Sequence, residues 1–263
     1  MIRLTFADGI ARIALDRAAA RNALSTAAWH DLAAIVAQVP AEARVVLLAS
    51  DVPGIFCAGA DLADLARLAH DVPARAAFRT AMRAGIDAVA ALPMPVVAAV
   101  EGECHGAGVA LALACDLIVA AAHARFAIPP ARLGIGYPAP DVARLVARIG
   151  QGQVARLLFT AAAVDTDEAL RIGLADAITD PAALAATVAA NDAAALRLLS
   201  ARCATRPTRR MIARSRIRSP RHASPRAPRA TYELEITAMF PTCSLRTKCV
   251  HEQERVERIA RVL

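Results

Sequence analysis

The sequence has few aromatic residues and no long apolar run, although it is rich in alanine. Aromatic residues make up only 3% of the 263 residues, whereas 57% are hydrophobic. No uninterrupted apolar run reaches the roughly 18 residues that a membrane-spanning helix needs. The opening residues, MIRLTFADG, lack the apolar core of a secretory signal. We therefore expect a soluble, cytoplasmic protein that does not enter a membrane.

The six cysteines lack the spacing of a metal site, because the chain contains no Cys-x-x-Cys pair. Thiols of intracellular proteins are usually kept reduced. We therefore expect buried or free thiols rather than disulfides, and no bound metal.

Acidic residues are missing from residues 201–230, which contain ten arginines. The net charge is −3 over residues 1–200 and +10 over residues 201–263. We therefore divide the chain into a core, residues 1–199, and an Arg/Pro-rich region, residues 200–263. An unstructured stretch is expected first and a partly helical pattern from Thr231. The basic charge alone would suit nucleic acid, but the region has almost no interleaved aromatics for base stacking, so we do not expect such a partner.

The first half of the core alternates strand and helix patterns. Asp8-Gly9 predicts a hairpin turn, and Ser25 is a plausible N-cap for a helix that carries Trp29. Residues 44–49 predict a buried strand, followed by a loop from Ser50 to Phe56. A short helix is expected after Asp61, and a longer one from Pro73 to about Ala91.

The second half of the core continues the same pattern. We expect an extended piece at 125–128, a loop over 129–138, and two helices, 140–149 and 151–160, separated by Gly150. A further helix begins at Asp165 or Thr166. Residues 174–179 predict a last strand, and Pro181 opens a helix to about Leu199. Together these patterns predict an α/β fold built from successive strand–strand–helix units.

The central stretch runs from Val96 to Ala121, VVAAVEGECHGAGVALALACDLIVAA. It reads as a buried strand, a glycine turn, an apolar helix and a second strand. An earlier turn, CAGADL at 57–62, also follows a buried strand and leads into a helix. Glycines in such turns let a ligand approach the main chain closely. Each turn can therefore offer a backbone N–H to the same oxygen.

These motifs resemble those of the crotonase (enoyl-CoA hydratase/isomerase) superfamily. The resemblance covers roughly residues 1–200. It is carried by FCAGADL at 56–62, by VEGECHGAGVALALACDL at 100–117, by RNALS at 21–25 and by ALRIGLAD at 169–176. It implies a crotonase-like spiral of ββα units, and an enzyme that acts on an acyl-CoA thioester with no cofactor beyond the coenzyme A of its substrate. It also implies a homotrimer or a dimer of trimers, and fatty acid metabolism as the setting.

The resemblance implies that two main-chain amides hold the thioester oxygen while an enolate forms. The matching positions are Ala60 and Ala107. The residues around them, Ala58, Gly59, Asp61, Leu62 and Gly106, would bind the substrate. Asp61 also reads as an acidic partner of a helix start. Arg21 and Arg132 would lie near the phosphates of coenzyme A.

Hydratases of this superfamily use two glutamates to activate a water molecule. At the matching positions this chain has Ala110 and Pro130, neither of which can transfer a proton. Loss of a positioned acid or base costs about 10²–10⁴ in rate. The resemblance therefore implies an enoyl-CoA hydratase/isomerase-type lyase or isomerase without the usual glutamate pair.

Four other side chains are candidates for catalytic groups. Tyr137, in LGIGYP, resembles the tyrosine of methylmalonyl-CoA decarboxylase-type members and would orient a substrate carboxylate; alternatively, its ring packs beneath the acyl pocket with its O–H on a backbone group. His105, near Glu101 and Glu103, is a candidate acid or base. Asp64 and Asp141 are expected to be solvated charges rather than catalysts.

Three functional hypotheses remain open from the sequence. The first is an enolate-forming acyl-CoA enzyme, and the second is a decarboxylase of the methylmalonyl-CoA type. The third is a catalytically inactive acyl-CoA-binding protein, which the apolar residues at 110 and 130 favour.

Overall fold

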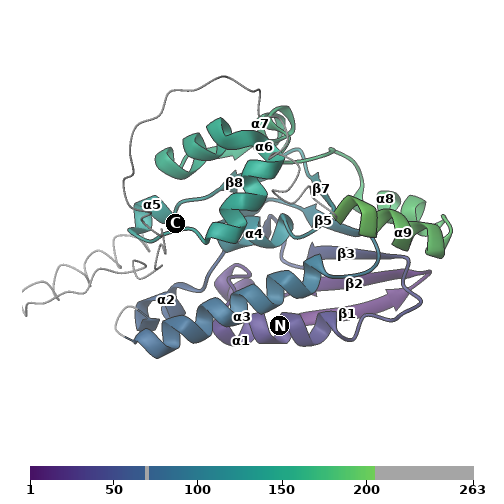
Figure 1. Cartoon of the computed structure of the whole chain (residues 1–263), viewed down its shortest axis with the longest axis horizontal. Coiled ribbons are helices and arrows are strands. Elements are labelled where there is room, and N and C mark those ends of the chain that lie inside the picture. Colours follow the sequence, from purple (N-terminus) through teal and green to yellow (C-terminus); the bar gives the residue numbers. More distant parts are fainter. Residues whose placement is uncertain (69–70, 205–263) are drawn as a thin grey trace, which may run out of the picture.

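The computed structural model of the protein describes residues 1–68 and 71–204, and its strands form two sheets (Figure 1). The first sheet has five strands in the order β1-β2-β3-β5-β7. Its strands are β1 (Ile2–Ala7), β2 (Ile10–Leu15), β3 (Val45–Ser50), β5 (Val96–Val100) and β7 (Leu117–Ala120). The second sheet has four strands, β4 (Ile55–Cys57), β6 (Glu103–His105), β8 (Arg125–Ala127) and β9 (Ala163–Asp165), in that order.

The chain passes between the two sheets once in each turn. A strand of the first sheet is followed at once by a strand of the second, as β3 by β4, β5 by β6, and β7 by β8. All three strands reached in this way lie parallel within each sheet, whereas the hairpin β1–β2 and the pair β8–β9 are antiparallel. Helices lead from β4 to β5 and from β6 to β7, back to the first sheet, whereas the helices after β8 lead to β9 of the second sheet. The predicted α/β spiral of ββα units is confirmed.

The helices begin and end largely where capping residues place them. They are η1 (Ala18–Ala20), α1 (Thr26–Val36), α2 (Leu62–Leu68), α3 (Val72–Ala90), α4 (Ala107–Ala112), α5 (Pro130–Leu133), α6 (Ala139–Thr160), α7 (Thr166–Ile172), α8 (Pro181–Ala189) and α9 (Ala193–Ala204). Ser25 caps α1 by accepting a hydrogen bond from the Ala28 N–H, as predicted. Asp165 caps α7 in the same way. Gly150, with φ 76°, breaks α6 into the two predicted segments.

The first sheet is covered on both faces. The main core includes the fully buried Trp29 and Ile86, from α1 and α3. A second cluster on the sheet includes Val45 and Val97, and the small residues Ala185 and Ala189 of α8 pack against it. Figure 1 shows α1 and α3 side by side along one side of the fold, with α8 and α9 at another end. Sheets covered on both faces read as continuous apolar runs, which explains VVLLA and VVAAV.

Four local predictions were wrong. Residues 50–56 are not wholly loop, because they contain the start of β4, and residues 129–138 contain the short helix α5. Residues 174–179 form no strand; Ala177 makes only an isolated bridge to Val119. The helix from Pro181 ends at Ala189, and α9 starts after a break. These elements have three or four residues or pass a short break, and periodicity cannot resolve such lengths.

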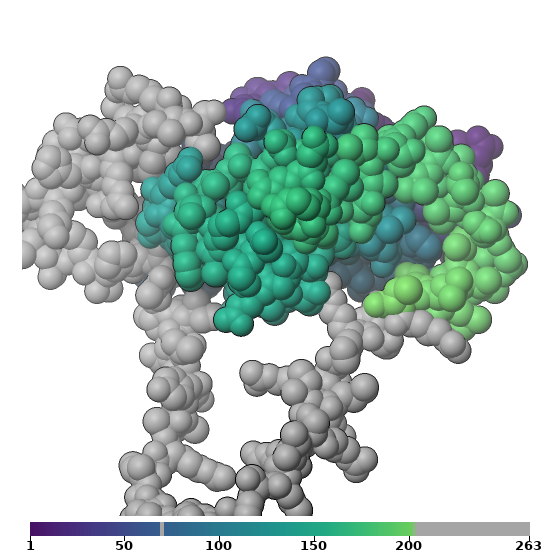
Figure 2. Space-filling model, turned by 90° about the horizontal axis from the view of Figure 1, so that it is seen from above, coloured from purple at the N-terminus to yellow at the C-terminus, as the bar shows by residue number. Residues whose placement is uncertain are grey.

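The remaining predictions for the Arg/Pro-rich region fall on residues 205–263, outside those described. In the described part no single helix is long and apolar enough to cross a membrane. The helical segments 181–189 and 193–201, which are bent relative to each other, reach the required length and apolar composition only when taken together. Figure 2 shows the face formed by the later elements of the core, in teal and green.

Candidate functional site

The two glycine-bearing corners lie at the ends of neighbouring strands. β4 leads into Ala58-Gly59-Ala60 and its parallel partner β6 leads into Gly106-Ala107. Gly59 has φ +101°, which L side chains rarely adopt. A Cβ atom built on Gly59 would lie 2.8 Å from the His105 carbonyl oxygen and 3.3 Å from the Ala107 nitrogen. The corners therefore touch through their main chains, and glycine is needed for this contact.

The N–H groups of Ala60 and Ala107 have no hydrogen-bond partner within residues 1–68 and 71–204. Their neighbours are bonded: the Ala58 N–H donates to the Arg21 carbonyl, and the Asp61 N–H to the Leu24 carbonyl. Both alanines line the same cavity. Since backbone donors are nearly always paired, two unpaired N–H groups at one cavity indicate a place for an external acceptor.

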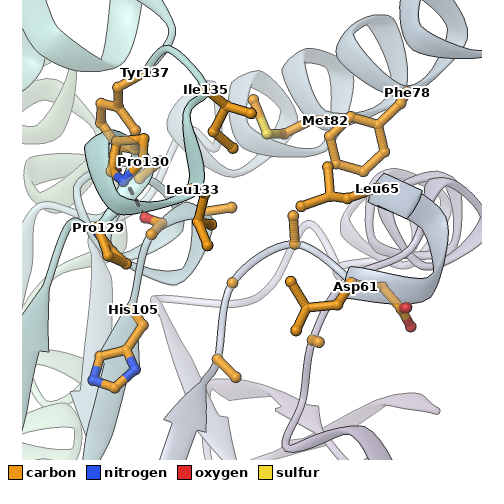
Figure 3. A pocket seen from close by; sticks show the side chains of 18 of the residues that line it. Asp61, Leu65, Phe78, Met82, His105, Pro129, Pro130, Leu133, Ile135 and Tyr137 are labelled. Carbon is orange, nitrogen blue, oxygen red and sulfur yellow. Dashed lines mark hydrogen bonds between the residues drawn. The ribbon is translucent and has the colours of Figure 1, made fainter. Parts of the chain in front are cut away.

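The cavity has a volume of about 390 Å³, which is in the range of small-molecule sites. Its walls are mostly apolar, and Figure 3 shows side chains from α3 facing those of the loop around α5 across it. The larger apolar side chains are Leu62, Leu65, Phe78, Met82, Leu133 and Ile135. This lining suits an acyl chain.

Ala110 and Pro130 also line the cavity, and both are buried. Ala110 belongs to α4 and Pro130 opens α5. Neither side chain can carry a proton, so this part of the wall provides no acid or base.

Tyr137 lies in the cavity wall with its hydroxyl turned to the second corner. The O–H donates to the Gly106 carbonyl oxygen over 3.0 Å. Burial raises the pKa of the phenol well above its usual value. A phenol has one proton to donate, so this hydroxyl is already committed as a donor. The geometry matches the packed-ring alternative given above.

His105 lines the cavity just before the second corner, and it is half-buried. Burial lowers the pKa of its imidazole, and the nearby Arg21 and Arg125 lower it further. Glu103 forms an ion pair with Arg21, and Glu101 is exposed beyond the break at Gly102. Within the described residues, His105 forms no hydrogen bond or ion pair with either glutamate.

The first corner is held by a buried polar network. Asn22, which is 1% exposed, accepts a hydrogen bond from the Arg17 N–H and donates to Ser50 and to the Phe56 carbonyl. The Asp61 carboxylate forms an ion pair with Arg17, with 2.5 Å between Oδ2 and Nη1. It also accepts hydrogen bonds from N–H groups at the start of α2. Figure 3 shows this carboxylate turned away from the apolar side chains. The Asp61 side chain therefore stabilises the start of α2, although Asp61 is one of the residues that line the cavity.

The expectation that Asp64 and Asp141 are solvated was wrong. Asp64 is 5% exposed and accepts hydrogen bonds from the N–H and hydroxyl of Thr26. Asp141 is fully buried, lines the cavity, and contacts Arg83 and Arg144. Sequence reasoning missed Arg83 altogether. Arg83 lies one helical turn before Asp87 on α3, and in the sequence this spacing indicates only an ordinary solvated ion pair between the two residues.

The remaining site predictions divide into two groups. Arg21, Ala58 and Leu62 line the cavity, whereas Arg132 is exposed on α5 and does not line it. The buried thiols do not suit nucleophilic chemistry, since burial raises the pKa of Cys57 to about 12. Among the described residues no group of histidine, cysteine and carboxylate side chains could hold a metal ion.

Comparisons with known proteins give a family match. Residues 5–206 match the family model for enoyl-CoA hydratase/isomerase. The chain is similar to mitochondrial methylglutaconyl-CoA hydratase of Mus musculus, with 36% identity over 168 residues, 63% of this chain and 53% of that protein. It thus spans about half the length of this relative. The YngF protein of Bacillus subtilis, named as an enoyl-CoA hydratase/isomerase, is 34% identical over 72% of this chain and 76% of its own.

Solved structures show the same fold. The crystal structure of enoyl-CoA hydratase from Bacillus anthracis superposes with a TM-score of 0.73 and 31% identity, covering 78% of this chain and 82% of that one. An enoyl-CoA hydratase/carnithine racemase from Magnetospirillum magneticum gives a TM-score of 0.74 at 27% identity, over 81% of this chain and 85% of that one.

Proposed function

Because the chain belongs to the enoyl-CoA hydratase/isomerase family, we propose that it binds an acyl-CoA thioester and stabilises its enolate between the N–H groups of Ala60 and Ala107. The observation that carries this proposal is the pair of unpaired backbone donors in the wall of one cavity. An enolate oxygen carries more negative charge than a thioester carbonyl, so both donors favour the reacting state.

The strand arrangement supports the same proposal. Ala60 and Ala107 follow the neighbouring parallel strands β4 and β6. Such strands lie about 4.8 Å apart, and an N–H···O bond joins atoms about 2.9 Å apart. Two donors separated by one strand spacing can therefore reach a single oxygen lying between them. The spacing of the second sheet would thus set the width of the anion site.

The remainder of the ligand follows from the lining. The apolar side chains of α3 and α5 would hold the acyl chain. Arg21, which lines the cavity, and the exposed Arg132 would approach the phosphates of coenzyme A. We infer no group besides the coenzyme A of the substrate, and a homotrimer or a dimer of trimers is the assembly proposed for the enzyme.

Proton transfer at the enolate would fall to His105. Asp61 is engaged by Arg17 and Tyr137 donates to Gly106, whereas His105 is the remaining titratable residue among these candidates that lines the cavity. Its lowered pKa favours the neutral form, which can accept a proton. Ala110 and Pro130 leave the positions of the usual hydratase glutamates without a proton carrier. Isomerisation or another enolate reaction therefore fits this site better than rapid hydration.

The decarboxylase hypothesis is less well supported. It needs Tyr137 to donate to a substrate carboxylate, but that proton is given to the Gly106 carbonyl. The inactive acyl-CoA-binding hypothesis stays as the second candidate, because the apolar residues at 110 and 130 favour it.

A pair of ligands tests the anion site directly. Butyryl-CoA has the thioester carbonyl, whereas S-butyl-CoA is a thioether without it. Calorimetry should give about tenfold tighter binding of the thioester, since two hydrogen bonds are lost in the thioether. Equal affinities would contradict the proposed role of Ala60 and Ala107.

Enolate formation separates the two candidates. Butyryl-CoA incubated with the protein in D₂O should gain deuterium at the α-carbon, as followed by mass spectrometry. Binding without exchange, and without turnover of crotonyl-CoA or methylmalonyl-CoA by chromatography, would favour the binding protein. The variant His105→Gln should slow the exchange while it leaves the affinity for butyryl-CoA within about threefold.

A further inference from the structure

Asp141 is a charged side chain in an otherwise apolar part of the cavity. It lies in the first turn of α6, has no exposed surface and lines the cavity together with Phe78 and Met82. Burying a carboxylate is costly unless it is paired and hydrogen-bonded. A carboxylate at this position therefore needs partners for both of its oxygens.

Only one oxygen of Asp141 has partners among the described residues. Its Oδ1 accepts from Arg83 Nη1 over 3.0 Å and from Arg144 Nη1 over 3.2 Å. Its Oδ2 is buried and has no hydrogen-bond partner in the part of the chain that the structure describes. The nearby hydroxyl of Tyr137 cannot supply one, because it donates to Gly106. A buried acceptor without a partner thus belongs to a residue of the cavity wall.

We propose that Asp141 is a specificity-determining residue, whose Oδ2 accepts a hydrogen bond from a hydroxyl group on the acyl part of the substrate. The inference rests on the proposed function, because it requires the cavity to hold an acyl chain. It adds a substrate class to that function, the hydroxylated acyl-CoA thioesters.

The charges around Asp141 select a neutral donor. A substrate carboxylate would be attracted by the buried Nη2 of Arg83, which has no hydrogen-bond partner among the described residues, but it would also face Oδ2 of Asp141, which repels it. An ammonium group would approach Arg83 and Arg144, which already contact Oδ1. A hydroxyl donates one hydrogen bond and brings no charge, so it meets neither repulsion. Hydrogen bonds to charged groups are about twice as strong as neutral ones.

The test compares ligands that differ by one hydroxyl. Binding of butyryl-CoA, 2-hydroxybutyryl-CoA, 3-hydroxybutyryl-CoA and 4-hydroxybutyryl-CoA to the full chain is measured by calorimetry. At least one isomer should bind about ten- to hundredfold tighter than butyryl-CoA. Equal or weaker binding of all three hydroxylated ligands would overturn the inference.

A matched pair of variants assigns the preference to Asp141. Asp141→Asn should reduce the preference for the best isomer to less than about threefold, because the open acceptor is replaced. Asp87→Asn is the control, since Asp87 also pairs with Arg83 and Arg144 but is more than half exposed and does not line the cavity. It should keep the wild-type preference. A preference that survives in Asp141→Asn assigns the hydroxyl to another residue and overturns the inference.

Failure of the proposed function is distinguishable from failure of this inference. If butyryl-CoA and all three isomers fail to bind to the wild-type chain, the acyl-CoA site itself is wrong. If they bind without preference, only the role of Asp141 is wrong. The wild-type comparison needs no variant, so it stands even if Asp141→Asn does not fold.

Discussion

The cavity has two walls of different kinds. One is made by main chain, at the corners after β4 and β6, and the other by side chains of α3 and the segment from α5 to α6. The main-chain wall depends on glycines and on strand pairing, and the residues that offer N–H groups are plain alanines. The side-chain wall depends on individual groups such as Asp141. The comparison suggests that binding of the thioester and choice of the acyl group are set by separate parts of the molecule.

The largest effect is expected from Gly59→Ala, which should disrupt the main-chain wall. The added Cβ would lie 2.8 Å from the His105 carbonyl oxygen, so the two corners must move apart. Loss of one oxyanion donor costs about 10²–10³ in rate, and we expect a loss of this size in α-deuterium exchange of butyryl-CoA. Retention of more than a tenth of the wild-type rate would contradict the role of the corner.

Gly54→Ala is the matched control for this variant. Gly54 also has positive φ, at +72°, but a Cβ there meets nothing within 4 Å. The control carries the backbone strain without the contact between the corners. It should keep the exchange rate within about threefold once the folded fraction is corrected.

The second prediction concerns the support of the main-chain wall. Asn22→Ala removes three hydrogen bonds from a buried residue that has φ 55°. The free energy of unfolding should fall by about 2–4 kcal/mol, as measured by urea denaturation. Asn191→Ala removes an exposed amide that caps nearby carbonyls, and it should cost less than about 0.5 kcal/mol. Similar losses in both variants would refute the supporting role.

The third prediction tests whether Tyr137 belongs to the packing of its wall or to the chemistry. Tyr137→Phe keeps the ring and removes the hydrogen bond to Gly106, whose carbonyl also accepts from Val109 and Ala110. We therefore expect less than about 1 kcal/mol of stability to be lost, and a change in butyryl-CoA affinity below about fivefold. A hundredfold loss of turnover would show instead that the phenol contacts the substrate.

The smallest expected effect is a pH dependence at the boundary between the two walls. Burial, with help from Arg21 and Arg125, lowers the pKa of His105 in the folded chain. As the pH falls below about 6.5, His105 therefore binds a proton in the unfolded chain before it does so in the folded chain. Stability is full above that pH and falls as the pH drops through the lower folded pKa.

The variant His105→Gln should flatten this fall below about pH 6.5, as seen in denaturant midpoints. His30→Gln, at an exposed site on α1, is the control and should keep the wild-type slope. An unchanged slope in His105→Gln would assign the fall to other groups.

The sequence was informative for the main-chain wall and poor for the side-chain wall. Glycine turns after β-branched runs predicted the corners, because local backbone geometry restricts those positions to glycine. The burial of Asp141 was missed, since one of its two partners, Arg83, lies on α3, more than fifty residues earlier in the chain. The three-residue strand β8 was predicted as an extended piece at 125–128, but β6 was missed because it takes its pairing from distant strands rather than from its own pattern.

The unpaired N–H groups of Ala60 and Ala107 have a consequence for isotope labelling of the free protein. Amide hydrogens without an acceptor have no local bond to protect them from exchange with solvent. In a frame of bonded strands these two should therefore exchange early, while their neighbours Ala58 and Asp61 retain their hydrogens longer. The molecule thus carries its own reporter of occupancy, since a ligand oxygen seated between the two amides would slow both together.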